Sequence, residues 1–225
     1  METTTAESGR RQRQRRADGE RTRAAILRAA ASLATVHGLD GLSIGTLATA
    51  IGMSKSGLYA HFGSKEELQL ATVAEAEKIL FEEVVEPALA APAGVAQLAA
   101  ACDAFCSYVG RRVFPGGCFF AATSLELGAR PGPVKDRLAA IQSDFTSLLQ
   151  SFAVTAIEQH ELPEDEDPAR LAFELHALLL GADLKFVLND DPGVLDLAYE
   201  AALRRLGLPL RPRSASREPK TGRDA

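Results

Sequence analysis

The sequence predicts an all-α protein of about nine helices, with a three-helix head followed by a larger helical body. Two observations predict this fold class. Apolar residues recur at three- and four-residue spacing along most of the 225-residue chain, which places them on one face of a helix. The breaks between these stretches carry Ser, Asp, Gly or Pro, which are typical of helix boundaries. The predicted divisions are a disordered basic arm (1–19), the head (20–63), the body (64–206) and a disordered tail (207–225).

The first predicted helix runs from Glu20 to His37. Its apolar positions fall at helical spacing, and Gly38 supplies a stop at its C-terminal end. We expect this helix to brace the other two helices of the head.

Two short helices joined by a tight turn are predicted between Ser43 and Lys65. Gly52 lies where the backbone must reverse without interference from a Cβ. Ser43 and Ser54 are each placed to cap the N-terminus of one helix. These features predict a helix-turn-helix. The residues expected on its inner side are Ile44, Leu47, Ala48, Ile51, Leu58 and Phe62.

The exposed face of the second short helix carries short polar, small and cationic side chains. Lysine can donate to guanine, serine can pair with several base edges, and glycine lets the backbone approach the bases. We therefore expect this face to enter a DNA groove, with Tyr59, His61 and Lys65 reaching phosphates. The residues of this face are Lys55, Ser56, Gly57, Tyr59, Ala60 and His61.

The body is predicted to begin with a long helix that starts at a capping box formed by Ser64 and Glu67 and ends near Pro87. It joins the head to the body, so we expect it to transmit movement between them. Further helical patterns cover residues 95–112, 118–127 and 134–159.

Asp–Pro pairs at 167–168 and 191–192 are predicted to start the last two helices, with aspartate as N-cap and proline at the first helical position. The first of these helices is apolar on more than one side, which predicts burial against both its own core and a partner. We expect a two-fold homodimer with a four-helix interface. The predicted interface residues are Leu178, Ala182, Leu195, Tyr199 and Ala202.

The charge is distributed unevenly along the chain. Its net charge is −5, yet residues 1–65 hold ten basic and five acidic side chains, whereas residues 66–206 hold ten basic and twenty-three acidic ones. A basic head on an acidic body favours a DNA-binding function, while an acidic body also serves solubility. The run Arg10–Arg16 either lies along DNA, at phosphates or in a minor groove, or is a solvated tail.

The segment Gly52–Leu68, GMSKSGLYAHFGSKEEL, resembles the recognition-helix signature of TetR-type transcriptional regulators. The similarity in order and spacing extends over residues 21–73. By this resemblance, Lys55, Ser56, Gly57 and His61 face bases, and Thr46, Tyr59 and Lys65 face phosphates. Many members have Gly or Pro and then Thr or Ser where this chain has Ser56 and Gly57, so the bases that are read cannot be carried over.

The resemblance implies a ligand-responsive regulator, a repressor that binds a near-palindromic double-stranded DNA operator as a homodimer and is released by a small apolar effector. It also implies an effector pocket in the body, where aromatic residues and a few polar groups concentrate. The candidates for its lining are Phe105, Tyr108, Cys118, Phe119, Thr123, Phe145, Phe152 and His176.

Three cysteines, an odd count, favour reduced thiols, and the chain shows neither a secretory signal nor a membrane-spanning stretch. A cytoplasmic location is therefore expected. Cys118 follows a Gly–Gly kink at a predicted helix start, where a thiol pKa can be lowered, so an oxidant sensor through Cys118 is an alternative to burial as a small apolar residue.

Motifs for chemistry are absent from the sequence: it has no Gly-rich phosphate loop, no G-x-S-x-G and no H-E-x-x-H. We therefore expect no enzyme activity, no cofactor and no metal. The main alternative is a nonspecific or architectural DNA-binding protein without an effector. An enzyme that works in the aromatic body is a weaker alternative.

Overall fold

The computed structural model describes residues 3–210. This part of the chain is entirely helical and contains no strand, which confirms the predicted fold class. The helix α4 (Lys65–Leu80), a π-helical turn (Phe81–Val85) and α5 (Glu86–Leu89) follow one another without a gap, so residues 3–210 form nine continuous helices. None of them is both long enough and apolar enough to cross a membrane.

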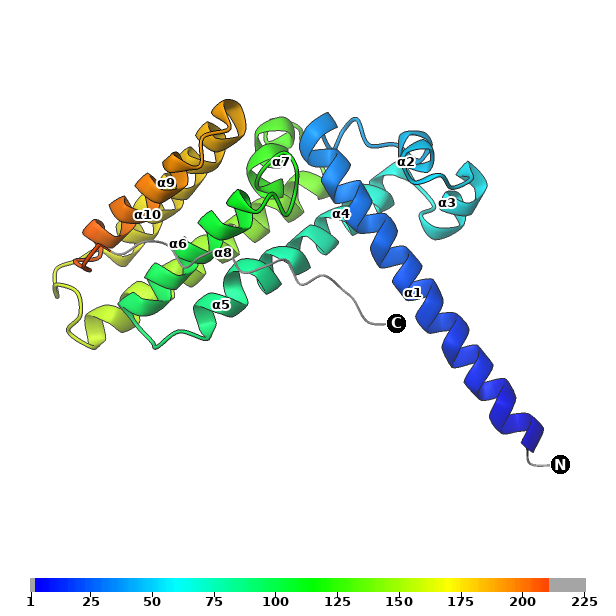
Figure 1. The fold of residues 1–225 in the computed structure, drawn as a ribbon, viewed down its shortest axis with the longest axis horizontal. Coiled ribbons are helices and arrows are strands. Elements are labelled where there is room, and N and C mark those ends of the chain that lie inside the picture. The colour runs from blue at the N-terminus through cyan, green and yellow to red at the C-terminus, as the bar shows by residue number, and fades with distance from the viewer. Residues whose placement is uncertain (1–2, 211–225) are drawn as a thin grey trace.

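The head consists of α1 (Thr3–His37), α2 (Ile44–Ile51) and α3 (Lys55–His61). Figure 1 shows α2 and α3 at one end of the molecule, while α5 to α10 extend toward the other. The C-terminal part of α1 packs against α4 and α7, so the head is held to the body by packed helices.

Residues 3–19, predicted to be disordered, belong to α1, whose N-terminal part projects away from the rest of the chain (Figure 1). The prediction was wrong because a missing apolar stripe was taken as a missing helix. Five arginines and two glutamines make up seven of these seventeen residues, and both residue types favour helix. The packed turns from Ile26 to Ala34 supply the nucleus from which such a helix can extend.

The long helix after the head continues past its predicted end near Pro87, to Leu89. The π-helical turn comes directly before α5, and the N–H of Glu86 donates to the carbonyl of Phe81. Pro87 then occupies the second position of α5, where a missing N–H is tolerated as at a helix start. The proline therefore follows a change of helical register instead of ending the helix.

The other body helices are α6 (Val95–Gly110), α7 (Phe119–Leu127), α8 (Pro133–Glu158), α9 (Pro168–Asn189) and α10 (Gly193–Arg205). The carboxylate of Asp167 accepts from the N–H groups of Ala169 and Arg170, as predicted for the N-cap of α9. The start of α10 differs by one residue, because Pro192 is its N-cap and Asp191 accepts from the N–H of Gly193 at 2.9 Å.

The predicted disordered tail from 207 lies largely outside the described residues. In its described part, the N–H of Leu208 donates to the carbonyl of Leu203 at 2.9 Å, and the Leu208 side chain packs on the core. This contact closes the end of α10.

Candidate nucleic-acid interface and body cavities

The geometry of the helix-turn-helix is confirmed. The Ser43 hydroxyl accepts from the N–H of Thr46, and the Thr46 hydroxyl accepts from the N–H of Ser43, which completes a capping box at α2. Gly52 ends α2 with φ +69, a left-handed conformation that favours glycine. Ser54 caps α3 through the N–H of Gly57 at 3.1 Å.

The face of α3 that was predicted to contact bases lies on the surface. Lys55, Ser56 and Tyr59 are exposed, and Gly57 and His61 are partly exposed. On the opposite side, α3 is anchored by the buried side chains of Leu58 and Phe62. The Arg23 guanidinium stacks over the Phe62 ring, 4.8 Å from its centroid. A helix of seven residues is thus held by packing, and its polar face is left free for a partner.

Two of the predicted phosphate contacts already have partners within the chain. The Thr46 hydroxyl is engaged in the capping box with Ser43. The Lys65 ammonium lies 3.0 Å from Asp40 Oδ1. Hydrogen bonds from Lys65 and Arg130 hold the pKa of the Asp40 carboxyl below its usual value. Lys65 therefore reaches a DNA phosphate only by sharing or leaving its carboxylate partner.

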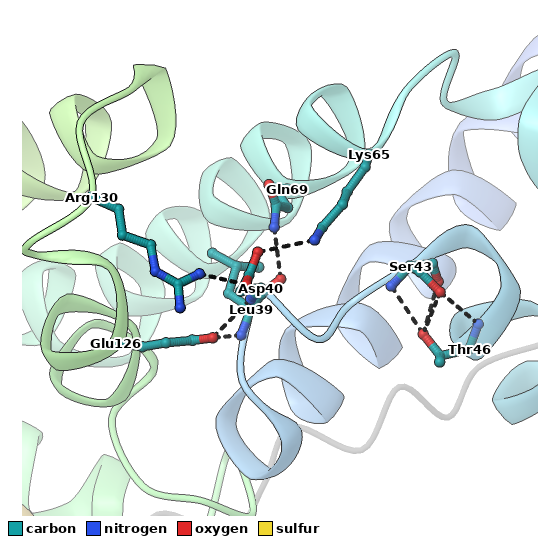
Figure 2. A network of polar contacts seen from close by, with 8 residues as sticks. All are labelled: Leu39, Asp40, Ser43, Thr46, Lys65, Gln69, Glu126 and Arg130. Atoms are coloured by element: carbon teal, nitrogen blue, oxygen red, sulfur yellow. Dashed lines mark hydrogen bonds and ion pairs between the residues drawn. The ribbon is translucent and has the colours of Figure 1, made fainter.

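A polar network joins the body to the loop between α1 and α2 (Figure 2). Glu126, on α7, accepts from the N–H groups of Leu39 and Asp40 at 2.7 and 2.9 Å. The Gln69 amide, on α4, donates to the Leu39 carbonyl at 2.8 Å, and Arg130 pairs with Asp40. This network was missing from the sequence prediction, because its partners lie up to 90 residues apart and no local motif marks them.

The aromatic residues predicted to line an effector pocket are packed in the core of the body. Phe105, Tyr108, Phe114 and Phe119 follow one another with ring centroids 6.0 to 6.1 Å apart. His176 is partly buried, and its Nδ1 lies 3.1 Å from the Thr146 hydroxyl. None of the eight predicted lining residues borders the body cavities of about 770, 450 and 190 Å³, so their contact with an effector stays a prediction.

A cavity of about 450 Å³ lies where α7, α8 and α9 meet the end of α1. We call it the Asp183 cavity after its one acidic residue. Its lining residues are Thr35, Gly116, Ala121, Ala122, Ser124, Leu125, Gln142, Leu180, Gly181, Asp183, Leu184 and Val187.

Asp183 is only 4% exposed, and its Oδ1 accepts from the N–H of Cys118 at 2.8 Å. Burial raises the pKa of this carboxyl to about 6, although the bond from Cys118 acts in the opposite direction. Gly117 has φ +85, and a Cβ there would lie 2.4 Å from Asp183 Oδ1. Glycine at 117 therefore permits the close approach of the carboxylate.

Cys118 lacks the lowered pKa on which the oxidant-sensor alternative depends. The thiol is buried at the N-cap of α7, and burial raises its pKa to about 12, with the nearby Asp183 carboxylate adding to the rise. A buried thiol with this pKa is almost entirely protonated at neutral pH and is a poor nucleophile. The structure supports the alternative of burial as a small apolar residue.

A groove of about 770 Å³ runs between α9 and α10 on the outer side of the body. Leu178 and Ala182 line it, although Ala182 is only 3% exposed, and their place in a dimer interface stays a prediction. Leu195, Tyr199 and Ala202 are instead buried in the chain's own core, so their assignment to the interface was wrong. The large exposed apolar residues of these two helices are Phe173, Leu184, Val187, Leu188 and Leu197.

Among the described residues, no group of three or more His, Cys, Asp or Glu side chains is arranged to hold a metal ion. The exposed helix-turn-helix on a separate helical body defines a transcriptional regulator of the helix-turn-helix class. Residues 26–72 match the family model of bacterial regulatory proteins of the tetR family, and residues 94–202 match that of the tetracyclin repressor-like C-terminal domain. These ranges together cover more than half of the chain, which therefore belongs to the TetR family.

Solved structures of the same family share the fold. A TetR transcriptional regulator from Chloroflexus aurantiacus is 27% identical, with 84% of this chain and 96% of that chain covered and a TM-score of 0.78. A TetR-family regulator from Cytophaga hutchinsonii is 21% identical, with 85% and 96% covered and a TM-score of 0.72.

AibR, whose structure was solved in complex with isovaleryl coenzyme A and operator DNA, is 24% identical. The match covers 80% of this chain and 97% of AibR, with a TM-score of 0.62. No curated protein matches the chain in sequence.

Proposed function

We propose that this chain is a ligand-responsive repressor, which binds a near-palindromic operator as a homodimer and is released by a small-molecule effector. The observation that carries the proposal is the exposed polar face of α3, which is anchored by Leu58 and Phe62 from behind. A short helix in this position can enter a major groove, and Lys55, Ser56 and Gly57 are residue types that suit base edges.

Dimerisation through α9 and α10 is part of the proposal. Phe173 is 69% and Leu197 is 65% exposed, and both border the groove between these helices. Apolar side chains this exposed are typical of an interface. Two copies related by a two-fold axis would present two α3 helices to half-sites about 34 Å apart, or a multiple of that distance.

Effector response is supported by the body cavities and by the fold shared with AibR, which was solved with both isovaleryl coenzyme A and operator DNA. An effector that prefers a conformation with wrongly spaced heads weakens operator binding, typically by about 1 to 3 kcal/mol of coupling. The hydrogen bonds of Glu126 to the loop between α1 and α2 connect α7 directly to the head. We further propose a cytoplasmic, non-enzymatic protein whose N-terminal arginines approach DNA phosphates.

The test is selection of bound sequences from a random DNA pool by the purified protein. A Lys55→Ala, Tyr59→Ala double variant runs beside it, because both side chains are exposed and their loss leaves the core intact. Lys135→Ala, at the start of α8, removes one positive charge outside the helix-turn-helix and is the control. We expect a two-fold symmetric site with the wild type and the control, and loss of that site with the double variant.

If the wild type enriches no sequence yet retains DNA, the specific-repressor function is wrong and the nonspecific or architectural alternative takes its place. If the double variant selects the same site as the wild type, α3 is not the reading helix.

A further inference from the structure

The Asp183 cavity combines apolar walls with one buried carboxylate. Leu125, Leu184 and Val187 face it and are unusually exposed, with Leu125 83% exposed. Its volume of about 450 Å³ lies within the range of roughly 300 to 1,000 Å³ that is typical of sites for small organic molecules. The cavity can therefore accept an apolar molecule and presents a single ionisable group to it.

Among the side chains that the structure describes, no lysine, arginine or histidine forms an ion pair with Asp183. Its one hydrogen-bond donor is the N–H of Cys118, at the N-terminus of α7. The titratable groups that interact with it are Cys118 and Tyr108, whose pKa values are raised by burial, so both are neutral near pH 7. The α7 dipole offsets part of the carboxylate charge, and no positively charged side chain offsets the rest.

A capping role alone does not require a charge at this position. An asparagine would accept the same N–H of Cys118 through its side-chain oxygen and would avoid the cost of burying an anion. Unlike an asparagine side chain, however, the Asp183 carboxylate attracts a positively charged ligand that enters the cavity.

We infer that the Asp183 cavity binds an organic cation, with an ammonium group at the Asp183 carboxylate and an apolar body against Leu125, Leu184 and Val187. Gln142 Nε2 and Ser124 Oγ, which lie 3.4 Å apart and also line the cavity, offer hydrogen bonds to a polar group on that body. The role of this cation as the effector rests on the function proposed above.

The position of the cavity connects it to the head. Its wall includes Ala121, Ala122 and Leu125 of α7, and Glu126 follows directly on the same helix. An occupant that moves α7 would also move the carboxylate that holds the N–H groups of Leu39 and Asp40. Cation binding would in this way change the placement of the head.

The test compares 4-phenylbutylamine with 4-phenylbutan-1-ol, which has the same apolar body and no charge. Binding of each to the full-length protein is measured by isothermal titration calorimetry at pH 7.5. We expect the wild type to bind the amine at least about tenfold more tightly than the alcohol, because an ammonium–carboxylate contact in an apolar cavity is strong. Asp183→Asn, which keeps an acceptor for Cys118, should bind both compounds equally.

Asp136→Asn removes an exposed carboxylate at the start of α8 and is the matched control, expected to keep the wild-type preference. The wild type at pH 5 supplies a measurement that needs no variant, since Asp183 is then mostly protonated and the preference for the amine should fall. Equal binding of the two compounds by the wild type at pH 7.5 overturns the inference, and so does a preference that survives in Asp183→Asn.

The DNA selection described above separates the two proposals. A symmetric operator without an amine preference overturns the cation site and leaves the repressor function in place. An amine preference without a selected operator supports the cation site and overturns its role as an effector site.

Discussion

Glu126 on α7 accepts a hydrogen bond at 2.7 Å from the backbone N–H of Leu39, which lies 87 residues earlier in the chain. The second oxygen of the same carboxylate accepts from the N–H of Asp40. The loop between α1 and α2 has no helical partners for these two donors, so the body supplies them. The head is therefore positioned by a side chain of the body as well as by the packing of α1.

Replacement of Glu126 by alanine should destabilise the protein. Two backbone N–H groups would lose a charged acceptor, which costs about 1.5 to 3 kcal/mol for such hydrogen bonds. We expect a decrease of that size in the free energy of unfolding, measured by urea denaturation. Glu126→Gln should cost less, because its one oxygen still accepts. The exposed Glu164 provides the control variant, Glu164→Ala, and equal stability of the two alanine variants would contradict the prediction.

Gly116 should not tolerate a side chain. A Cβ at this position would lie 2.1 Å from the backbone carbonyl oxygen of Thr35, at the end of α1. Because backbone atoms cannot move aside like a flexible side chain, Gly116→Ala should lower the free energy of unfolding by about 1 to 3 kcal/mol or more. Gly19→Ala, where no atom lies within 4 Å of the added Cβ, is the control and should leave stability unchanged or raise it. An unchanged melting temperature for Gly116→Ala would contradict the contact with Thr35.

Local chemistry explains which parts of the fold the sequence predicts well. Ser43, Gly52 and Ser54 act on donors and dihedral angles within three residues of themselves, so their roles follow from spacing alone. The contact between Glu126 and Leu39 depends on how α7 packs against α1, and no short-range pattern encodes it. The sequence does not distinguish a charged residue that is solvated on a helix face from one that accepts a hydrogen bond from a backbone N–H.

The dimer surface and Asp183 illustrate two further limits of the sequence. Periodicity indicates that α9 and α10 have apolar stripes, but it does not say which stripe faces the chain's own core, so Tyr199 was assigned to the surface and Leu197 was overlooked. Asp183 did carry a signal, since it interrupts an apolar run. Its role as a ligand-binding group could be inferred only from the cavity, whose lining comes from four separate helices.

The dimer proposal predicts that glutamate at Phe173 or Leu197 produces monomers. Both side chains border the groove between α9 and α10 and are largely exposed, so a charge there should be harmless to the isolated chain but costly in an apolar interface. Light scattering after size-exclusion chromatography measures the mass. Leu89→Glu adds the same charge at an exposed leucine on α5 and should leave the dimer intact. Dimers of wild-type stability in Phe173→Glu and Leu197→Glu would rule out this face.

The last prediction concerns the pH dependence of stability. Burial raises the pKa of Asp183 to about 6 in the folded protein, from a usual value of 3.8. The folded state therefore binds the proton more tightly than the unfolded state. The resulting stability is fully present below pH 3.8 and is lost as the pH rises through about 6. Without a ligand, the ionised carboxylate thus destabilises the fold at neutral pH.

Asp183→Asn removes this ionisation and keeps an acceptor for the N–H of Cys118. It should be more stable than the wild type at pH 8, by about 1 to 3 kcal/mol, and the difference should shrink at pH 5. Urea denaturation of both proteins at the two pH values measures it, and the comparison cancels the contributions of other groups, such as Glu166, whose pKa Arg205 lowers to about 2. A stability difference that is the same at pH 5 and pH 8 would mean that Asp183 does not titrate between them. Such a result would place the carboxylate in a more polar environment than the cavity provides.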